Sequence, residues 1–362
     1  MDRYIGVDVH ASTCTIAVVD ARGKRLSLTV VATNGERLVQ FFKDMTGRLH
    51  VILEEGTQSG WVSEILTPVV HDLAVVMVER RVKGNKDDEE DAYCLAEMRR
   101  SGKFKRVYKN LGAMKKLRWL VKSYGYVTTD LVRTRNRLKA AYRSEGIQTG
   151  GKDVYKEDAE MAWLPKLEEA HQEAALFLHT AFDSAEALKD AAAHAVVEEG
   201  RKHTAFGLLQ SIPGLGPIRA AQLLAVVVTP TRFKTKRQFW NYCGFAIMTA
   251  SSSDWKHLDN GRMVRKKNQL TRGLNWDHNP VMKNVFKGAA KTVVMSTSGP
   301  LKADYERIVA KGTRENLALL SLARKIAAIT LAVWKSGQPY RENFVPPPPK
   351  EASKSDTTLK QG

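Results

Sequence analysis

The sequence predicts an α/β domain followed by a long helical segment and a mostly helical C-terminal domain. Three observations lead to this prediction. Short Ile/Val-rich runs alternate with amphipathic stretches over about the first 110 residues. A leucine-rich pattern with a seven-residue period then begins near Met114, and longer apolar stretches of helical spacing fill the remainder. We therefore divide the chain into 1–110, 111–205 and 206–342, and we expect a disordered tail over 343–362.

The composition restricts the class of protein. The 362 residues carry a formal net charge of +18, which favours a polyanionic partner, and nucleic acid before a membrane. The three cysteines, Cys14, Cys94 and Cys243, are odd in number and far apart. This disfavours a disulfide framework or a zinc knuckle and is typical of a reducing cytoplasm. Acidic residues near the N-terminus argue against a signal peptide, and we expect no apolar run of membrane-spanning length.

The first predicted strand covers residues 4–9 and contains Asp8 near its end. A charge at such a place needs a partner or a metal; the alternative is an ordinary aspartate that caps the following turn. Residues 13–19 alternate as a second strand, and after a turn residues 25–31 return as a third. These three strands predict an antiparallel meander.

Strands and helices then alternate. Asn34 is expected to cap a helix that ends near Met45, and residues 50–53 form a fourth strand that leads into Glu54 and Glu55. A helix over 61–69 and a fifth strand over 73–78 follow. Three strands, a helix and further alternating elements predict a sheet of the ribonuclease-H type.

Carboxylates end two of these strands and open the next helix. Asp8 ends the first strand, Glu54 ends the fourth, and Asp88 and Asp91 lie three residues apart on one face of the helix opened by residues 87–91. Oxygen ligands suit Mg²⁺, and a pair of such ions can clamp both oxygens of a phosphoryl transfer. We therefore expect two Mg²⁺ ions between these side chains. The alternative for residues 87–91 is a solvated acidic helix start, which the helix dipole favours.

Glu54 and Glu55 are not equivalent candidates. Side chains alternate along a strand, so only one of the two can point with Asp8. Glu54 directly continues the apolar run and is the preferred residue, and Glu55 is the alternative.

The middle of the chain predicts paired long helices. One helix is expected over about 114–143, where Leu117, Tyr124, Leu131 and Leu138 repeat every seven residues as in a coiled coil. A second helical stretch covers about 158–201 and is interrupted at Pro165. The pair serves either as a spacer or as a dimerisation element. Cations on the first helix, among them Arg133 and Arg137, are expected to follow a nucleic acid backbone.

The C-terminal part contains a glycine-rich turn before an apolar helix over 218–228. The turn, I-P-G-L-G-P at 212–217, resembles a helix-hairpin-helix element, which grips the DNA backbone rather than reading sequence. The alternative is a plain turn between helices. We expect Gly214, Gly216 and Arg219 to contact nucleic acid here. A later cationic stretch adds four further candidates, Arg262, Arg265, Lys266 and Lys267.

Together these motifs resemble the DEDD transposases of insertion sequences, whose relatives include the Piv-type DNA invertases. The resemblance rests on G-V-D-V-H around Asp8, L-E-E-G-T-Q-S-G-W around Glu54, K-D-D-E-E-D-A around Asp88 and Asp91, I-P-G-L-G-P at 212–217 and a serine-containing loop after Gly244. The E-E-G-T-Q form of the second motif is similar to that of one subgroup.

The resemblance implies a RuvC-like N-terminal domain in which Asp8, Glu54, Asp88 and Asp91 bind Mg²⁺. It also implies a C-terminal domain with a serine nucleophile, and Ser252 occupies that position, with Ser251 and Ser253 as alternatives. Such enzymes cut and rejoin donor and target DNA through a covalent phosphoserine. They are guided by a noncoding bridge RNA, assemble from dimers into tetramers and act in the prokaryotic cytoplasm at the nucleoid.

Two features depart from the family pattern. Many members have a glycine beside the serine, where this chain has Ser253-Asp254-Trp255, and the second motif is longer than the E-A-T-G form.

Three rival functions follow from the same residues. The first is a metal-dependent nuclease or junction resolvase without serine chemistry. The second is a sugar-kinase-like ATPase, which is disfavoured because the α/β half contains no glycine-rich phosphate loop. The third is a nucleic-acid-binding protein in which the carboxylates only cap secondary structure.

Overall fold

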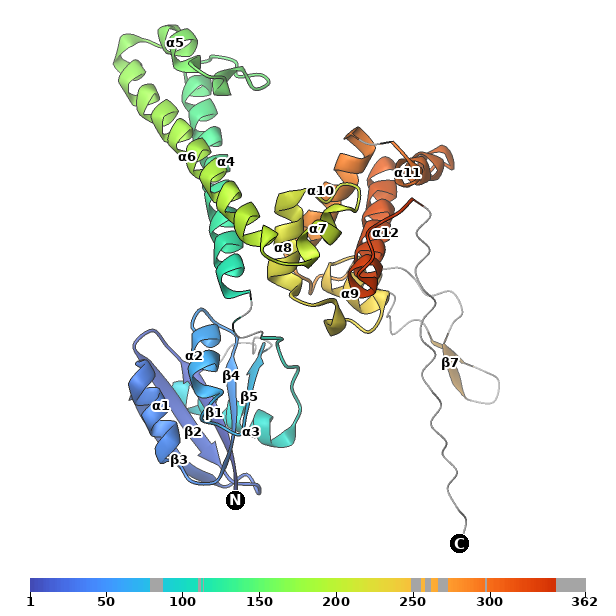
Figure 1. Cartoon of the computed structure of the whole chain (residues 1–362). Helices are drawn as coiled ribbons and strands as arrows, with labels where there is room; N and C mark the ends of the chain where they lie inside the picture. Colours follow the sequence, from blue (N-terminus) through green and yellow to red (C-terminus); the bar gives the residue numbers. More distant parts are fainter. Residues whose placement is uncertain are drawn as a thin grey trace. The chain divides into compact units, whose positions relative to one another are not determined.

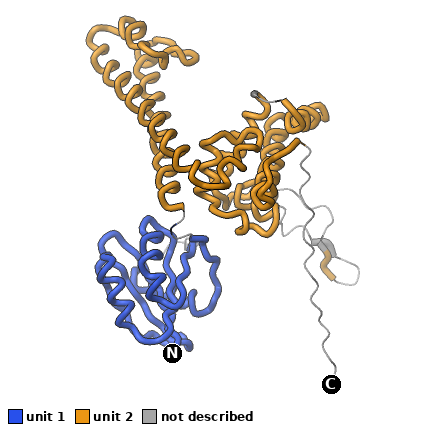
Figure 2. The backbone as a smooth tube through the Cα atoms, viewed as in Figure 1, with its two compact units in different colours: residues 1–113 blue, residues 114–362 orange. Residues whose placement is uncertain are grey.

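The computed structural model describes residues 1–78, 87–109, 112, 114–248, 255–257, 262–265, 273–296 and 298–342. The chain divides into two compact units, residues 1–113 and 114–362 (Figure 2). The predicted tail over 343–362 lies outside the described residues.

The first unit is built on a mixed five-stranded sheet with the strand order β3-β2-β1-β4-β5 (Figure 1). An antiparallel meander is formed by β1 (Asp2–Val9), β2 (Thr13–Val19) and β3 (Arg25–Ala32). The sheet continues with β4 (Arg48–Glu54) and β5 (Asp72–Val76), which run parallel to β1. The α/β prediction is confirmed, and this arrangement is consistent with a ribonuclease-H-like domain.

One face of the sheet is covered by two helices, α1 (Gly35–Asp44) and α2 (Ser59–Leu66). The side chain of Asn34 accepts a hydrogen bond from the Arg37 N–H, as expected of an N-cap. The second helix ends earlier than residue 69 because Pro68 has no backbone N–H with which to continue the helical hydrogen bonds.

The opposite face of the sheet carries α3 (Asp88–Ser101). Gly6 of β1 makes this contact possible, because a Cβ on Gly6 would lie 2.0 Å from the Ala92 carbonyl oxygen and 2.5 Å from the Ala96 nitrogen. The helix backbone therefore rests directly on the strand. This contact fixes the first turn of α3 beside the end of β1.

The second unit begins with a helical hairpin in which α4 (Lys115–Ser144) packs along α6 (Glu169–Arg201) (Figure 1). Between them lie η1 (Asp153–Tyr155), α5 (Ala159–Trp163) and η2 (Leu164–Lys166). The second long helix starts at Glu169 rather than near 158, because Pro165 lies in the separate turn η2.

The heptad positions of α4 serve two different cores. Leu131 and Leu138 pack with residues of α6, whereas Leu117 belongs to the core of the C-terminal helices and the partly buried Tyr124 packs against it. The seven-residue repeat is therefore not one uniform seam between two helices.

The C-terminal helices share one large apolar core with the base of the hairpin. These elements are α7 (Ala205–Gln210), α8 (Pro217–Val227), η3 (Pro230–Arg232), α9 (Lys236–Tyr242), α10 (Pro280–Ser296), α11 (Pro300–Ala310) and α12 (Glu315–Ser336). A short antiparallel pair, β6 (Trp255–His257) and β7 (Met263–Arg265), precedes α10.

One described helix, α12, is long and apolar enough to cross a membrane by length and composition alone. This corrects the expectation that no apolar run approaches that length. Within the unit α12 is a core helix, with Leu322, Ile326 and Val333 among its buried residues. Its apolar character is therefore accounted for by packing against the other helices.

The contact between α3 and β1 yields a stability prediction. Gly6→Ala should lower the free energy of unfolding of the first unit by at least about 1–3 kcal/mol, because the new methyl group overlaps helix backbone that cannot rotate away. Urea unfolding followed by circular dichroism measures this change. The control is Gly60→Ala, where an added Cβ meets nothing within 4 Å. Equal stability of Gly6→Ala and the wild type would contradict the proposed close contact.

Candidate functional site

Two of the predicted carboxylates lie at the ends of adjacent parallel strands. The register pairs Val7 with Leu53, so Asp8 and Glu54 follow at neighbouring positions. Side chains alternate along each strand, and Gly6 of β1 and Ile52 of β4 face α3. Asp8 and Glu54 therefore share the face of the sheet that α3 covers.

The acidic start of α3 divides into separate roles. The Asp87 carboxylate caps the helix by accepting a hydrogen bond from the Glu89 N–H at 3.0 Å. Glu90 forms an ion pair of 2.8 Å with Arg25 of β3. Asp88 and Asp91 lie three residues apart on the helix, and their carboxylates lie on the side of Asp8 and Glu54. Part of the run is thus the ordinary helix start that the alternative interpretation assumed.

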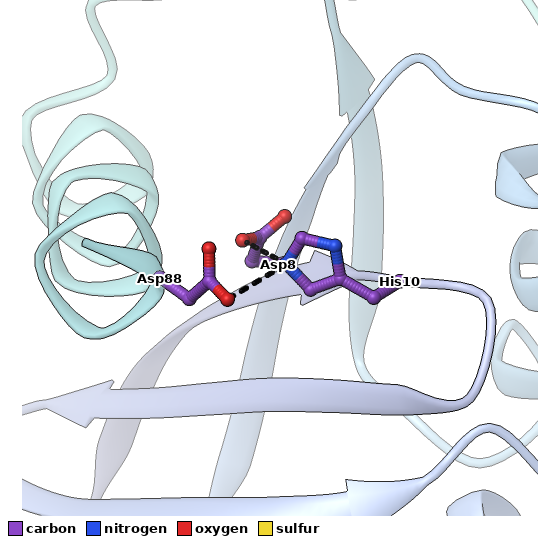
Figure 3. A group of neighbouring side chains, drawn as sticks. All are labelled: Asp8, His10 and Asp88. Carbon is purple, nitrogen blue, oxygen red and sulfur yellow. Dashed lines mark hydrogen bonds and ion pairs between the residues drawn. The ribbon is translucent and has the colours of Figure 1, made fainter. Parts of the chain in front are cut away.

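A histidine that the sequence analysis did not select joins this group. His10 Nε2 lies 3.0 Å from Asp8 Oδ2 and 3.3 Å from Asp88 Oδ2. Figure 3 shows Asp88 reaching from helix α3 toward His10 and Asp8, which come from β1 and the segment after it. The available signal was its spacing in G-V-D-V-H, because a residue two positions after Asp8 points to the same side of an extended chain.

The electrostatics of the two glutamates differ. Partial loss of hydration, together with the negative charges of Asp8 and Asp91, raises the pKa of Glu54. Glu55 instead forms an ion pair with Lys109, whose Nζ lies 2.7 Å from Glu55 Oε2. Lys109 Nζ also donates a hydrogen bond to Ser59 Oγ. Glu54 is therefore in the field of the other carboxylates, and the charge of Glu55 is balanced by a lysine.

The donor set suits a divalent cation. Carboxylate oxygens are the ligands that Mg²⁺ takes in proteins. Burial raises the pKa of Glu54, and the negative charges of Asp8 and Asp91 raise it further; a bound cation relieves this repulsion. The chemistry of these residues therefore fits the cation that a DEDD motif requires.

The glycine-rich turn between α7 and α8 is held against the core. Gly214 has a φ of +83°, and a Cβ there would lie 2.4 Å from the Ala289 carbonyl oxygen. Arg219 Nη1 donates to the Gly214 carbonyl oxygen at 2.9 Å and to Thr292 Oγ1 at 3.0 Å. Gly216 is exposed at the start of α8. Contact between any of these three residues and nucleic acid stays a prediction, and Arg219 already has an internal structural role.

The remaining predicted residues are distributed over two regions. Arg133 and Arg137 are exposed on α4, and Arg133 pairs with Asp130 at 3.0 Å. Arg262 is exposed just before β7, and Arg265 is the last residue of that strand. Five predicted residues lie outside the described part of the chain: the proposed nucleophile Ser252, its alternatives Ser251 and Ser253, and the cations Lys266 and Lys267.

The described residues on either side of 249–272 are hydrogen-bonded to each other. The Met248 N–H donates to the Gly273 carbonyl oxygen, and the Asn275 N–H donates to the Ala246 carbonyl oxygen, both at 2.9 Å. The nearly buried Asn275 amide also donates to Asn241 Oδ1 at 2.9 Å. The base of the serine-containing segment is thereby tied to α9 and to the core.

The crowding of carboxylates yields a second prediction. Glu54→Gln should raise the melting temperature of the metal-free protein at neutral pH, because it removes a charge that Asp8 and Asp91 repel. Because the pKa of Glu54 is higher in the folded state than in the unfolded state, the folded state loses stability as the pH rises from the unfolded-state pKa through the folded-state pKa. The gain should therefore vanish below that range. Glu55→Gln is the matched control and should lower or leave unchanged the melting temperature, since it removes the partner of Lys109. If Glu54→Gln lowered the melting temperature as much as Glu55→Gln does, the proposed repulsion between Glu54 and its neighbouring carboxylates would be contradicted.

Comparison with known proteins matches this chain to two family models. A family model for the DEDD transposase of IS110 matches residues 5–144, and a model described as the transposase IS116/IS110/IS902 family matches residues 207–306. A Streptomyces coelicolor protein named for the transposase of the IS117 mini-circle is 32% identical over 114 residues. That match covers 31% of this chain and 27% of the relative. The two family models together cover about two thirds of the sequence. The chain therefore belongs to the IS110 family of DEDD transposases.

Proposed function

We propose that this chain cuts and rejoins DNA as a divalent-metal-dependent transposase. The observation that carries the proposal is the gathering of carboxylates from β1, β4 and α3 in a chain of this family. Carboxylates that only cap secondary structure need not converge in this way, and Asp87 alone caps α3. The matched region spans 27% of the length of the Streptomyces coelicolor relative.

In this proposal Asp8, Glu54, Asp88 and Asp91 hold two Mg²⁺ ions. When bound, such ions stabilise negative charge on the attacking and leaving oxygens of a phosphoryl transfer. The chain itself would position these ligands through the contact of Gly6 with α3 and through the parallel register of β1 with β4. Metal-free repulsion at Glu54 supports the assignment of Glu54 over Glu55.

Ser252 is the proposed nucleophile. Its Oγ would form an ester bond with a DNA phosphorus atom while the bond from phosphorus to the neighbouring nucleoside oxygen breaks. The serine proton would pass to a base, and the reverse reaction on a new strand end would rejoin the DNA. A covalent intermediate retains the broken end, which recombination needs and simple hydrolysis does not provide.

The proposed partners are donor and target DNA, a noncoding bridge RNA and further copies of the chain. The net charge of +18 supports polyanionic partners. Candidate contacts are the exposed Arg133 and Arg137 on α4, the turn with Gly214, Gly216 and Arg219, and the cationic stretch from Arg262 to Lys267. The active assembly would be a dimer that forms a tetramer in the cytoplasm of a prokaryotic cell.

Substitutions at the acidic site and at the serine should have different effects. Asp8→Asn and Asp91→Asn should abolish cleavage and joining. Removing a residue that hydrogen-bonds to a metal ligand lowers activity by about 10–100-fold, and removing the ligand itself should lower it further. Ser252→Ala should remove joining and the covalent adduct while metal binding stays near normal. Incubation with labelled DNA, followed by peptide mass spectrometry of any adduct, measures both effects.

Ser251→Ala and Ser253→Ala are the matched controls and should retain the adduct. A nucleotide attached to Ser251 or Ser253 would move the proposed nucleophile by one residue. Metal-dependent cleavage without any adduct would favour the nuclease or resolvase alternative. Full strand transfer by Asp8→Asn would overturn the metal site itself.

The helical hairpin supplies a test of nucleic acid binding. Replacing Arg133 and Arg137 together by Gln should weaken binding to RNA from the noncoding segment beside the reading frame. The plot of log affinity against log salt should become shallower by about 0.7 to 0.9 per lost phosphate contact. Arg135→Gln is the control, because Arg135 pairs with Glu186 of α6 at 2.7 Å. An unchanged salt slope for the double variant would remove this surface from the proposal.

A further inference from the structure

His10 occupies the space between two of the proposed metal ligands. Its Nε2 atom and one carboxylate oxygen each from Asp8 and Asp88 all lie within 4.8 Å of one another (Figure 3). The three atoms come from the end of β1, the residue after it and the first turn of α3. A nitrogen donor thus joins two oxygen donors at this point.

The spacing of these atoms fits one coordination sphere. Neighbouring ligands of an octahedral ion with bonds of about 2.1 Å are about 3.0 Å apart. The observed separations are 3.0 Å from His10 Nε2 to Asp8 Oδ2 and 3.3 Å from His10 Nε2 to Asp88 Oδ2. We propose that His10 Nε2 is a direct ligand of one divalent cation and that it gives the site a preference for Mn²⁺ over Mg²⁺. This inference rests on the proposed metal site.

The preference follows from ligand chemistry. Carboxylate and water ligands suit Mg²⁺ and Mn²⁺ alike, whereas imidazole nitrogen is a ligand of transition metals. A site of carboxylates alone has little basis to separate the two ions. A nitrogen in the set strengthens Mn²⁺ binding and adds little to Mg²⁺ binding, so the ratio of the two affinities depends on His10.

The backbone of His10 is anchored on both sides. Its N–H donates to the Thr13 carbonyl oxygen at 2.9 Å, and its carbonyl oxygen accepts from Thr33 Oγ1 at 2.9 Å. Thr33 follows β3, so the turn after β1 is tied to the meander. The backbone that carries the imidazole is therefore held in place beside Asp8. This lowers the conformational entropy that His10 loses when it binds an ion.

The competing interpretation is that His10 only orients Asp8 through a hydrogen bond. A positioning role predicts equal losses for both metals when His10 is replaced, because Asp8 serves either ion. A ligand role predicts a loss confined to Mn²⁺. His10→Gln separates the two, since the glutamine amide can still donate a hydrogen bond to Asp8 but lacks the imidazole nitrogen.

The experiment uses the full-length protein and needs no DNA. Calorimetric titration with Mn²⁺ and with Mg²⁺ gives the two dissociation constants for the wild type, His10→Gln and His50→Gln. His50 is the matched control, because it forms a histidine–carboxylate pair of 3.0 Å with Asp2 toward the opposite end of the same strands. Pulsed electron paramagnetic resonance of bound Mn²⁺ then detects any directly bonded imidazole nitrogen.

We expect His10→Gln to raise the dissociation constant for Mn²⁺ by about tenfold or more and that for Mg²⁺ by only about twofold. The nitrogen signal should be present in the wild type and in His50→Gln and absent in His10→Gln. Retained Mg²⁺ binding shows that the variant is folded. If His10→Gln weakened the binding of Mn²⁺ and Mg²⁺ equally, or if the wild-type spectrum lacked a nitrogen signal, the ligand role of His10 would be overturned. Failure of the wild type to bind either ion would instead overturn the proposed metal site as a whole.

Discussion

The candidate site depends on the contact between the backbone of α3 and Gly6 of β1. No side chain fits at this position, because a Cβ would overlap the helix backbone at 2.0 Å. The contact places the first turn of the helix at the end of the strand, where Asp8 meets Asp88 through His10. The parallel register of β1 with β4 then brings Glu54 to the same edge. Gly6 thus brings α3 to β1, and the parallel register adds β4.

The acidic site lies in a strongly basic chain, and this contrast has a physical consequence. A net charge of +18 attracts nucleic acid, but clustered carboxylates repel a phosphate. The repulsion already acts within the protein, where Asp8 and Asp91 raise the pKa of Glu54. Divalent cations at the site would relieve this internal repulsion and would also allow a phosphate to approach. Cation binding and DNA binding are therefore coupled in the account proposed for this protein.

Much of the α/β domain was predictable from residue patterns, because local signals and tertiary packing agree there. Period-two alternation predicted that only one of Glu54 and Glu55 could lie with Asp8, and the ion pair of Glu55 with Lys109 is in keeping with the choice of Glu54. His10 was missed because its one signal, a spacing of two residues from Asp8 in G-V-D-V-H, does not by itself distinguish a ligand from an ordinary residue after a strand. The heptads of α4 also misled, since a seven-residue period does not say which core each leucine enters. The apolar character of α12 likewise depends on packing between distant segments, whereas the late start of α6 follows from the local break at Pro165.

We propose that Asp8, Glu54, Asp88 and Asp91 form a divalent cation site. The most direct measurement is a crystal structure of the protein with Mn²⁺, in which anomalous scattering locates the ions independently of the protein coordinates. The account predicts at least one strong anomalous peak at a bonding distance of about 2.0–2.2 Å from Asp8. Crystals that contain Mn²⁺ elsewhere but show no peak beside Asp8 would contradict it.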